Sequence, residues 1–342
     1  MSDQKLRVGV IGCGVGASHG FAYGHSPEYA LVAICDIQPA SFARFYERAG
    51  IQPGTVSEYT DFRAMIEQEN LDVVSVATPD DYHTDAVCFA SDFGVKGILC
   101  EKPLASSLAD ADRMIATIER NGTKVSVDHT RSWYPNYQVA RRSIRDGSFG
   151  GLTRIVAHMG GRRAMLFRNG THIVDAMCFF ADATPAWVLA VHERGFEDYG
   201  TAYKGEGGKD PLLDPGSTLI IEYTNGVRGI LNGAKHTPAI YEVELLGPSG
   251  RYWLTDSGGQ AWRTDAPEGA PLEIPAPWPG GGVGDLGDNL LPAVRELAQM
   301  VLHDAPSSSP PQRARDVMEI MFGALQSQAQ DNAKVRLPLA RG

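Results

Sequence analysis

Short apolar runs alternate with amphipathic stretches over the first 130 residues. The apolar runs have the length and composition of buried strands and lie at 6–12, 30–36, 72–78, 96–100 and 124–130. The stretches between them have helical spacing at 41–50, 61–70, 83–94 and 107–122. Strands that alternate with helices in this way predict a parallel sheet covered by helices. We therefore expect residues 1–127 to form a doubly wound, Rossmann-type domain.

The pattern changes after residue 127, where longer alternating runs indicate antiparallel strands. These runs lie at 152–160, 187–194, 217–234 and 240–256, with hairpin-type turns at 224–226 and 247–250. Helices are predicted at 136–148, 172–181, 288–303 and 312–328, and a Pro/Gly-rich loop at 266–288. Residues 128–342 are thus predicted to form an α+β domain with a mainly antiparallel open sheet. Its C-terminal helices are candidates to pack back on the first domain.

Composition narrows the class of protein. Of 342 residues, 43% are hydrophobic and 21% are charged, which is typical of a globular chain with two domains. The net charge of −10 argues against nucleic acid or an anionic membrane as a partner. The five cysteines lack zinc-site spacing, so we expect reduced thiols and no metal. The sequence shows no signal peptide and no apolar run of about 20 residues, so a cytoplasmic protein is expected.

A glycine-rich turn follows the first strand. Gly12, Gly14 and Ala17 fit the pattern G-x-G-x-x-G/A, and Asp36 ends the next strand. The first glycine permits a tight turn, the second lets the backbone approach a pyrophosphate, and a small third residue lets the helix pack on the strand. An acid after the second strand accepts hydrogen bonds from ribose hydroxyls. The turn, including Val15, and Asp36 are therefore predicted to bind NAD in preference to NADP.

The strand at 96–100 runs directly into Glu101-Lys102-Pro103. Taken alone, this tripeptide is typical of a solvated strand end that a proline stops. Its neighbours change the interpretation, because most of the chain resembles the glucose–fructose oxidoreductase, inositol dehydrogenase and MocA family of NAD(P)-dependent oxidoreductases. The resemblance rests on four motifs in order: Ala77-Thr78-Pro79 with His83, Glu101-Lys102-Pro103, SFGGLTRI at 148–155, and GTHIVDAMCFF at 170–180.

The resemblance implies that Lys102 lies beside the nicotinamide and the substrate hydroxyl, at the sheet edge where ligands gather. A positive nicotinamide ring disfavours the cationic form of the lysine, which suits a group that exchanges a proton. Glu101 is expected to face the cofactor, with Thr78 and Pro79 also in contact with it. His83 is expected to order the loop beneath the nicotinamide rather than to perform chemistry.

The helix predicted at 172–181 carries a second pair of candidates. His172 and Asp175 stand three residues apart and therefore share one face of a helix. A lone histidine more often packs or caps, but the resemblance implies that His172 takes the hydroxyl proton and that Asp175 contacts or orients the substrate. The family's usual aspartate four residues before this histidine is Arg168 here. Arg168 is a candidate for an anionic substrate group, or else Asn169 supplies the polar contact.

Other candidate pocket residues have less support. Relatives line the substrate site with the segment at 128–137, where Arg131, Trp133 and Tyr134 either contact a sugar or pack the domain junction. Further candidates for substrate contact are His158, Arg162, His236 and Tyr241. The charged, Gly-rich loop at 195–216 is either a mobile edge of the pocket or an inert insertion.

These features predict an NAD-dependent dehydrogenase acting on a secondary hydroxyl of a sugar, polyol or related cyclic compound, with Lys102 and His172 as catalytic residues. Two alternatives stay open: a lyase, isomerase or glycosidase that uses tightly bound NAD transiently, and a redox-inactive sugar sensor. Arg168 keeps both open, whereas Lys102 and His172 argue against the sensor. Helices on one face of an antiparallel sheet leave the other face uncovered, so a homodimer or homotetramer through that sheet is expected.

Overall fold

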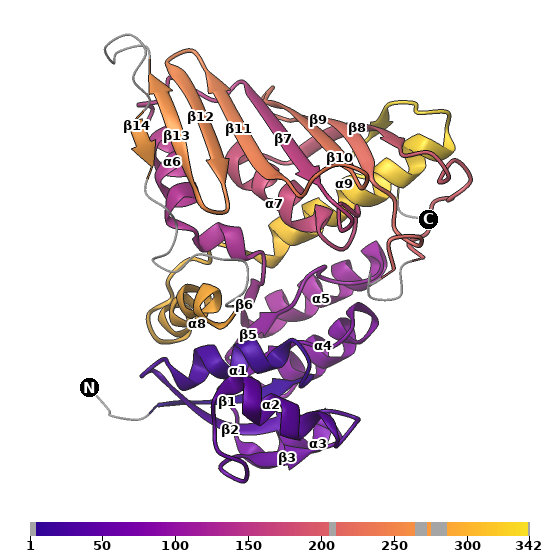
Figure 1. Ribbon diagram of the computed structural model, residues 1–342. Helices are drawn as coiled ribbons and strands as arrows, with labels where there is room; N and C mark the ends of the chain where they lie inside the picture. The colour runs from indigo at the N-terminus through magenta and orange to yellow at the C-terminus, as the bar shows by residue number, and fades with distance from the viewer. Residues whose placement is uncertain (1–4, 205–209, 264–271, 275–285, 341–342) are drawn as a thin grey trace. The chain divides into compact units, whose positions relative to one another are not determined.

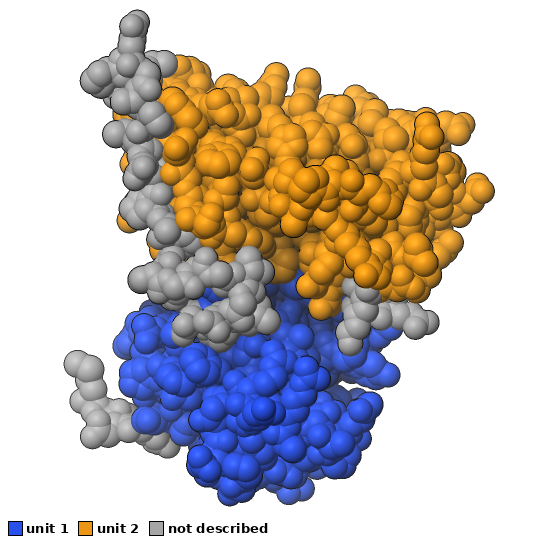
Figure 2. Space-filling view, in the orientation of Figure 1, with its two compact units in different colours: residues 1–130, 284–314 blue, residues 131–283, 315–342 orange. Residues whose placement is uncertain are grey.

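The computed structural model describes residues 5–204, 210–263, 272–274 and 286–340. The chain forms two compact units, which Figure 2 shows in different colours. Unit 1 comprises residues 1–130 and 284–314, and unit 2 comprises residues 131–283 and 315–342. The boundary expected at 127/128 lies close to this division, and the segment 284–314 returns to the first unit.

Unit 1 is built on a six-stranded parallel sheet, as the strand–helix repeat predicts (Figure 1). Its strands are β1 (Leu6–Ile11), β2 (Tyr29–Cys35), β3 (Ser57–Tyr59), β4 (Val73–Val76), β5 (Gly97–Cys100) and β6 (Lys124–Val127). They lie in the order β3-β2-β1-β4-β5-β6, so the order reverses between β1 and β4. In such a doubly wound sheet, ligands bind outside the carboxyl ends of the strands at this reversal. The sequence pattern does not predict β3, because its three residues carry no apolar run.

Helices flank this sheet, and their ends follow the capping signals of the sequence. They are α1 (Gly16–Gly24), α2 (Ser41–Ala49), α3 (Phe62–Glu69), α4 (His83–Asp92), α5 (Leu108–Asn121) and α8 (Leu286–His303). Ser107 Oγ accepts a hydrogen bond from the Asp110 N–H at 3.1 Å, and Gly122 ends α5 in the left-handed conformation. Helix α8 joins the core of unit 1, where the Tyr29 hydroxyl donates to the Val294 carbonyl at 2.7 Å.

Unit 2 contains a nine-stranded, mainly antiparallel sheet, which confirms the second fold prediction. Its strands are β7 (Arg154–Gly160), β8 (Pro185–His192), β9 (Ser217–Tyr223), β10 (Arg228–Ala234), β11 (Tyr241–Gly247), β12 (Gly250–Thr255), β13 (Gly258–Arg263), β14 (Leu272–Ile274) and β15 (Val335–Arg336). The order is β14-β13-β12-β11-β7-β10-β9-β8-β15, and within it only the β7–β10 pairing is parallel among the described residues. The two predicted hairpin turns join β9 to β10 and β11 to β12.

Helix α7 (Gly170–Ala181) packs against β7, β10 and β11 of this sheet. The alternation along β7 buries Ile155, Ala157 and Met159, whereas the residues between them are exposed or half-buried. Helices α6 (Pro135–Arg145) and α9 (Pro311–Ala329) complete the layer in Figure 1, although the first residues of α9 belong to unit 1. The sheet of unit 2 thus has one covered face.

Several element boundaries differ from the sequence prediction. The strand predicted at 124–130 ends at Val127, and a short 3₁₀ turn follows at Thr130–Trp133. Most of the loop predicted at 266–288 lies outside the described residues, although β14 falls inside it. In the described part of the chain, no helix is long and apolar enough to cross a membrane.

Candidate active site

The turn between β1 and α1 has the geometry of a nucleotide-binding loop. Gly12 has φ +94°, and a Cβ atom there would lie 2.5 Å from the Ala77 carbonyl oxygen, so only glycine fits. A Cβ atom on Gly14 would meet nothing within 4 Å, which leaves open space for a ligand to approach the backbone. A Cβ atom on Gly16 would lie 2.8 Å from Val10 Cγ1. Close packing of α1 on β1 therefore depends on Gly16 as well as on Ala17. No position of the glycine-rich motif marks Gly16.

Asp36 is held at this turn by the backbone. Its carboxylate accepts hydrogen bonds from the Cys13 N–H at 2.8 Å and from the Gln38 N–H at 2.9 Å. A positive group also reaches the turn, because Arg48 on α2 donates to the Gly14 carbonyl at 3.3 Å. The acid predicted to bind ribose is thus fixed beside the loop predicted to bind pyrophosphate.

The segment after β4 is tied to the segment after β5. His83 is fully buried, with Nδ1 2.9 Å from the Pro103 carbonyl and Nε2 3.0 Å from the Thr78 carbonyl. Both ring nitrogens are therefore engaged by backbone, which fits a role in ordering the loop. Thr78 Oγ1 is buried and has no hydrogen-bond partner among the described residues. Pro79 precedes the short helical turn at Asp80–Tyr82.

Lys102 is the second residue after β5 and is only 8% exposed. The peptide bond between Lys102 and Pro103 is cis. Its chain neighbour Glu101 accepts a hydrogen bond from the Lys102 N–H at 3.2 Å and lies 3.3 Å from His19 Nε2. A lysine at this depth stands at the carboxyl end of a central strand, as the resemblance implies.

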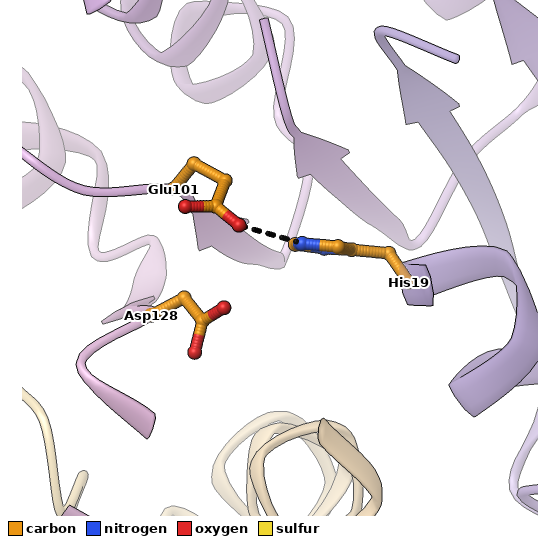
Figure 3. A group of neighbouring side chains, drawn as sticks. All are labelled: His19, Glu101 and Asp128. Carbon is orange, nitrogen blue, oxygen red and sulfur yellow. Dashed lines mark hydrogen bonds and ion pairs between the residues drawn. The ribbon is translucent and has the colours of Figure 1, made fainter. Parts of the chain in front are cut away.

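A buried polar cluster surrounds Glu101, and the sequence analysis did not single out its other members. His19 on α1, Glu101 and Asp128 point toward one another in Figure 3. Burial would raise the pKa of Glu101, but the hydrogen bond from His19 and the charge of Lys102 lower it to about 2. Burial and the Glu101 charge raise the pKa of Asp128 to about 7. At pH 5 to 6, the Glu101 carboxyl group is therefore ionised and the neighbouring Asp128 carboxyl group is protonated.

In unit 2, His172 stands in the first turn of α7. Every other residue of this helix is buried, and only His172 is partly exposed. Asp175, one turn on, is 1% exposed and accepts a hydrogen bond from the Ser132 hydroxyl at 3.2 Å. The two residues that the sequence placed on one helical face thus differ in burial: His172 is partly exposed, and Asp175 is internal.

The turn before α7 is fixed by a residue that the sequence analysis missed. Asp214 is fully buried and accepts hydrogen bonds from the Phe167 N–H at 3.1 Å and the Arg168 N–H at 2.9 Å. Burial raises the pKa of Asp214 to about 6, although these N–H groups lower it. Partial burial and the positive charge of Arg168 lower the pKa of Arg163, so the turn brings two guanidinium groups near each other. Asn169 precedes the helix without capping it through its side chain.

Arg131 is engaged inside unit 2. It donates to both carboxylate oxygens of Asp256, at 2.8 and 2.5 Å, and its guanidinium lies 3.4 Å from the centre of the Tyr241 ring. Trp133 is 7% exposed. These contacts fit the packing interpretation of Arg131 and Tyr241. Trp133 stays open between the two roles, because its buried Nε1 has no hydrogen-bond partner among the described residues.

Some candidates are not brought together with His172. His158 is exposed and alternates with Ala157 and Met159, so it lies on the sheet face opposite to the one that α7 covers. Arg162 and His236 are exposed in turns after β7 and β10. The residues at 205–209 of the loop predicted to edge the pocket lie outside the described part of the chain.

Comparison with known proteins agrees with this geometry. A family model described as "Oxidoreductase family, NAD-binding Rossmann fold", that of the Gfo/Idh/MocA proteins, matches residues 6–129. This part of the chain is similar to the NAD-binding domain of the Gfo/Idh/MocA oxidoreductase family. Its relatives include the myo-inositol 2-dehydrogenase of Thermotoga maritima, 24% identical over 72% of this chain and 74% of the relative. The levoglucosan dehydrogenase of Pseudarthrobacter phenanthrenivorans is 25% identical over 68% of each chain.

A third relative, the D-apiose dehydrogenase of Paraburkholderia graminis, is 34% identical. That match covers 43% of this chain and 38% of the relative, so the chain spans well under half of it. Among solved structures, a levoglucosan dehydrogenase in complex with NADH and L-sorbose is similar with a TM-score of 0.82 at 19% identity, covering 98% of this chain and all of the other. At that identity the likeness concerns the fold.

Proposed function

We propose that the protein is an NAD-dependent dehydrogenase that moves a hydride between nicotinamide and a secondary hydroxyl of a sugar, polyol or related cyclic compound. The observation that carries the proposal is Lys102, which is 8% exposed at the carboxyl end of β5 in an NAD-binding fold. Buried lysines at strand ends in this position suit proton exchange with a reacting hydroxyl. The names of the relatives support the substrate class.

The residues of unit 1 fit NAD. The open space at Gly14 would take the pyrophosphate against the backbone, and Asp36 would accept the ribose hydroxyls. Bound NAD supplies the hydride acceptor. The chain supplies the proton acceptor: as the C–H hydride leaves with both electrons and C=O forms, the hydroxyl proton passes to Lys102 Nζ. His172 is the second candidate for this proton.

The turn before α7 supports a substrate that carries negative charge. Arg168 and Arg163 lie near enough for the charge of one to lower the pKa of the other. An anionic group between two guanidinium groups would relieve this repulsion and accept charge-assisted hydrogen bonds. A uronic or aldonic acid is therefore proposed over its neutral parent sugar.

A panel of sugars, polyols and sugar acids, followed by NADH absorbance, tests these proposals. Each acid is assayed beside its neutral parent, so that charge is the variable. Net NADH formation with a member of the panel is the expected result, with the acid preferred. Arg168→Met should remove the preference for the acid while leaving turnover of the neutral sugar measurable. Equal kcat/KM for acid and parent would refute the charge proposal alone.

A second candidate function is a reaction in which NAD stays bound and is reduced only transiently. One relative, from Mediterraneibacter gnavus, is named a 2,7-anhydro-N-acetylneuraminate hydratase and is 33% identical over 27% of this chain. Product formation from a panel member without net NADH would favour this candidate. A chain that binds sugar with no product of either kind would instead favour a sensor.

We also propose a homo-oligomer formed through the open face of the unit 2 sheet. That face carries half-buried apolar side chains that are neighbours in the strand register: Val156, Ile230, Ile220 and Leu189. An apolar face of this kind usually meets a partner. Light scattering at micromolar concentration tests it, and a monodisperse monomer would be contrary evidence. A cytoplasmic location is part of the proposal, because free cysteines fit a reducing compartment.

A further inference from the structure

The polar cluster beside Lys102 has no assigned role in the proposed reaction. The ligand-type atoms of His19, Glu101 and Asp128 all lie within 4.8 Å of one another (Figure 3). His19 is fully buried and Asp128 is 6% exposed. Buried ionisable groups are costly unless paired, so a cluster at this depth needs an explanation.

The parallel sheet creates the cluster. Strands β5 and β6 pair with Cys100 opposite Val127, and the Asp128 N–H donates to the Cys100 carbonyl at 2.8 Å. The residues that follow these two strands therefore leave the sheet side by side. His19 reaches them from α1, with Nδ1 2.6 Å from Ser75 Oγ on β4. The arrangement is set by strand register rather than by flexible side chains.

The two carboxyl groups are not equivalent. Glu101 has a contact at each oxygen: Oε1 lies 3.3 Å from His19 Nε2, and Oε2 accepts from the Lys102 N–H at 3.2 Å. Asp128 Oδ1 is buried and has no hydrogen-bond partner among the described residues. Two carboxylates this close cannot both ionise cheaply in a buried place, so a single proton on the pair belongs to Asp128.

The charges around Asp128 also favour a proton on this residue. The ionisable groups around Asp128 are His19 and Tyr23 on α1, Cys100 at the end of β5, Glu101, Lys102 and the adjoining His129. Burial raises the pKa of Tyr23 and of Cys100, so both stay neutral near pH 7. Burial and the Glu101 charge raise the pKa of Asp128 to about 7, while His19 and Lys102 lower it.

We propose that Asp128 is a positioning residue that holds a proton shared with the Glu101 carboxylate and so limits the negative charge facing Lys102. This inference rests on the proposed function, in which Lys102 Nζ accepts the hydroxyl proton as hydride leaves carbon. Two carboxylates beside Lys102 would stabilise its ammonium form, which cannot accept a proton. One carboxylate and one neutral acid stabilise it less, so more of the lysine is present as the amine.

One imidazole and two carboxylates are also the composition of a cation site. The geometry favours a shared proton over a bound cation in this cluster. His19 already has a polar contact at each ring nitrogen, at Ser75 and at Glu101. Lys102 adds a positive charge that lowers the pKa of both carboxyl groups. A second positive charge in this space would be repelled.

The test is the pH profile of kcat/KM in Asp128→Asn, which is neutral at every pH and nearly isosteric. The acid limb, which reports loss of the amine form of Lys102, should stay nearly in place in this variant, because Asn keeps the neutral state that the proton gives Asp128. In Glu101→Gln, which removes the remaining negative charge, the limb should move to lower pH by about 0.5–2 units, the effect of one nearby charge at an effective dielectric constant of about 20. Asp92→Asn is the matched control, because Asp92 lies on the surface of the same unit and pairs with Arg120. Its profile should not move.

A second measurement does not depend on activity. Because the pKa of Asp128 is raised in the folded state, its contribution to stability is present below pH 4 and is lost as pH rises toward 7. Unfolding by urea between pH 4 and 8 should show this loss in the natural chain and in Asp92→Asn but not in Asp128→Asn. If Asp128→Asn does not fold, Glu101→Gln serves, because the folded-state pKa of Asp128 would then be lower, so that the loss of stability would be smaller and would end at lower pH.

The outcomes separate the two proposals. An acid limb that moves as far in Asp128→Asn as in Glu101→Gln would show that Asp128 is charged, and a limb that moves in neither variant would overturn the effect on Lys102; both outcomes leave the dehydrogenase proposal standing. Equal pH dependence of stability in all variants overturns the shared proton. A natural chain that turns over no substrate overturns the proposed function and the role toward Lys102, while the stability series still decides where the proton lies. Stabilisation by Mn²⁺ that Asp128→Asn abolishes would show a cation site instead.

Discussion

The carboxyl edge of the unit 1 sheet and the turn before α7 in unit 2 both carry candidate catalytic groups, but they are held in different ways. In unit 1, Asp36 follows β2 directly and Lys102 lies two residues beyond β5, so the ends of parallel strands set their places. In unit 2, the backbone of Arg168 is held by Asp214, 46 residues away in sequence. The first site depends on strand ends, and the second depends on long-range side-chain contacts.

The largest expected effect is on the strand-end side of this comparison. Lys102→Ala should lower turnover by roughly 10²–10⁴-fold, because it removes a positioned proton-transfer group. NAD affinity should stay nearly unchanged, since Gly14 and Asp36 make the proposed cofactor contacts. Steady-state kinetics measures the turnover, and NAD titration measures the affinity for the cofactor. Lys96→Ala is the control, because Lys96 is exposed and pairs with Asp72.

His172→Ala extends this prediction to unit 2. If both residues serve one proton transfer, the double variant should lose less than the product of the two single losses. Losses that multiply would show that the residues act in separate steps. Activity of Lys102→Ala within a few fold of the natural chain would refute its catalytic role altogether.

The contrast between strand ends and long-range contacts also explains which features could be predicted from the sequence. Strand ends are local features, so Gly12, Asp36 and Lys102 could be identified from motifs. The pairing of β5 with β6, which brings Asp128 beside Glu101, needed the sheet order as well. A strand–helix repeat predicts that a parallel sheet forms but does not by itself fix which strands are neighbours.

Unit 2 shows where prediction from sequence stopped. The sequence does not decide between a pocket role and a packing role for Arg131, because its carboxylate partner Asp256 lies 125 residues further along the chain. Asp214 lies in a loop interpreted only as a mobile edge or an insertion. Neither acid belongs to a motif, and a buried acid is recognisable only from its three-dimensional contacts. The side-chain direction of His158, in contrast, could have been inferred from the alternation along β7.

The second prediction tests the long-range support in unit 2. Asp214→Ala should lower the free energy of unfolding by about 1–3 kcal/mol, because the N–H groups of Phe167 and Arg168 lose a buried acceptor. Asp214→Asn should cost less, since an amide oxygen still accepts. Urea unfolding measures both, with the exposed Asp198→Ala as control. If Asp214→Ala costs no more than the control, the turn does not depend on this contact.

The same group should make stability depend on pH. The pKa of Asp214 is raised to about 6 in the folded chain, so its contribution to stability is present at pH below about 4 and is lost as pH rises to 6. The Asp214→Asn variant should lack this loss. The check is to measure the free energy of unfolding of this variant and of the natural chain between pH 4 and 6 and to compare how steeply each changes with pH.

The third prediction concerns cofactor choice at the strand-end site. Asp36→Ala should raise NADP affinity by about tenfold, or ~1.4 kcal/mol, because the carboxylate no longer repels a 2′-phosphate. Arg48, which reaches the Gly14 carbonyl, is placed to attract that phosphate once the acid is gone. The gain should therefore shrink in the double variant with Arg48→Ala. Tighter binding of NADP than of NAD by the natural chain would contradict the role given to Asp36.

The smallest effect separates two glycines of one turn. Gly14→Ala should change the free energy of unfolding by no more than about 0.5 kcal/mol, because its Cβ atom would meet no described residue other than its chain neighbours within 4 Å. Gly12→Ala should destabilise the fold much more, since its Cβ atom would lie 2.5 Å from the Ala77 carbonyl at a positive φ. Gly14→Ala should nevertheless weaken the binding of NAD, because the added methyl group occupies the space that the pyrophosphate needs. Urea unfolding and NAD titration on both variants give the contrast. Unchanged NAD affinity in a stable Gly14→Ala protein would show that the cofactor does not approach the turn at this residue, and the pyrophosphate assignment would move elsewhere in the loop.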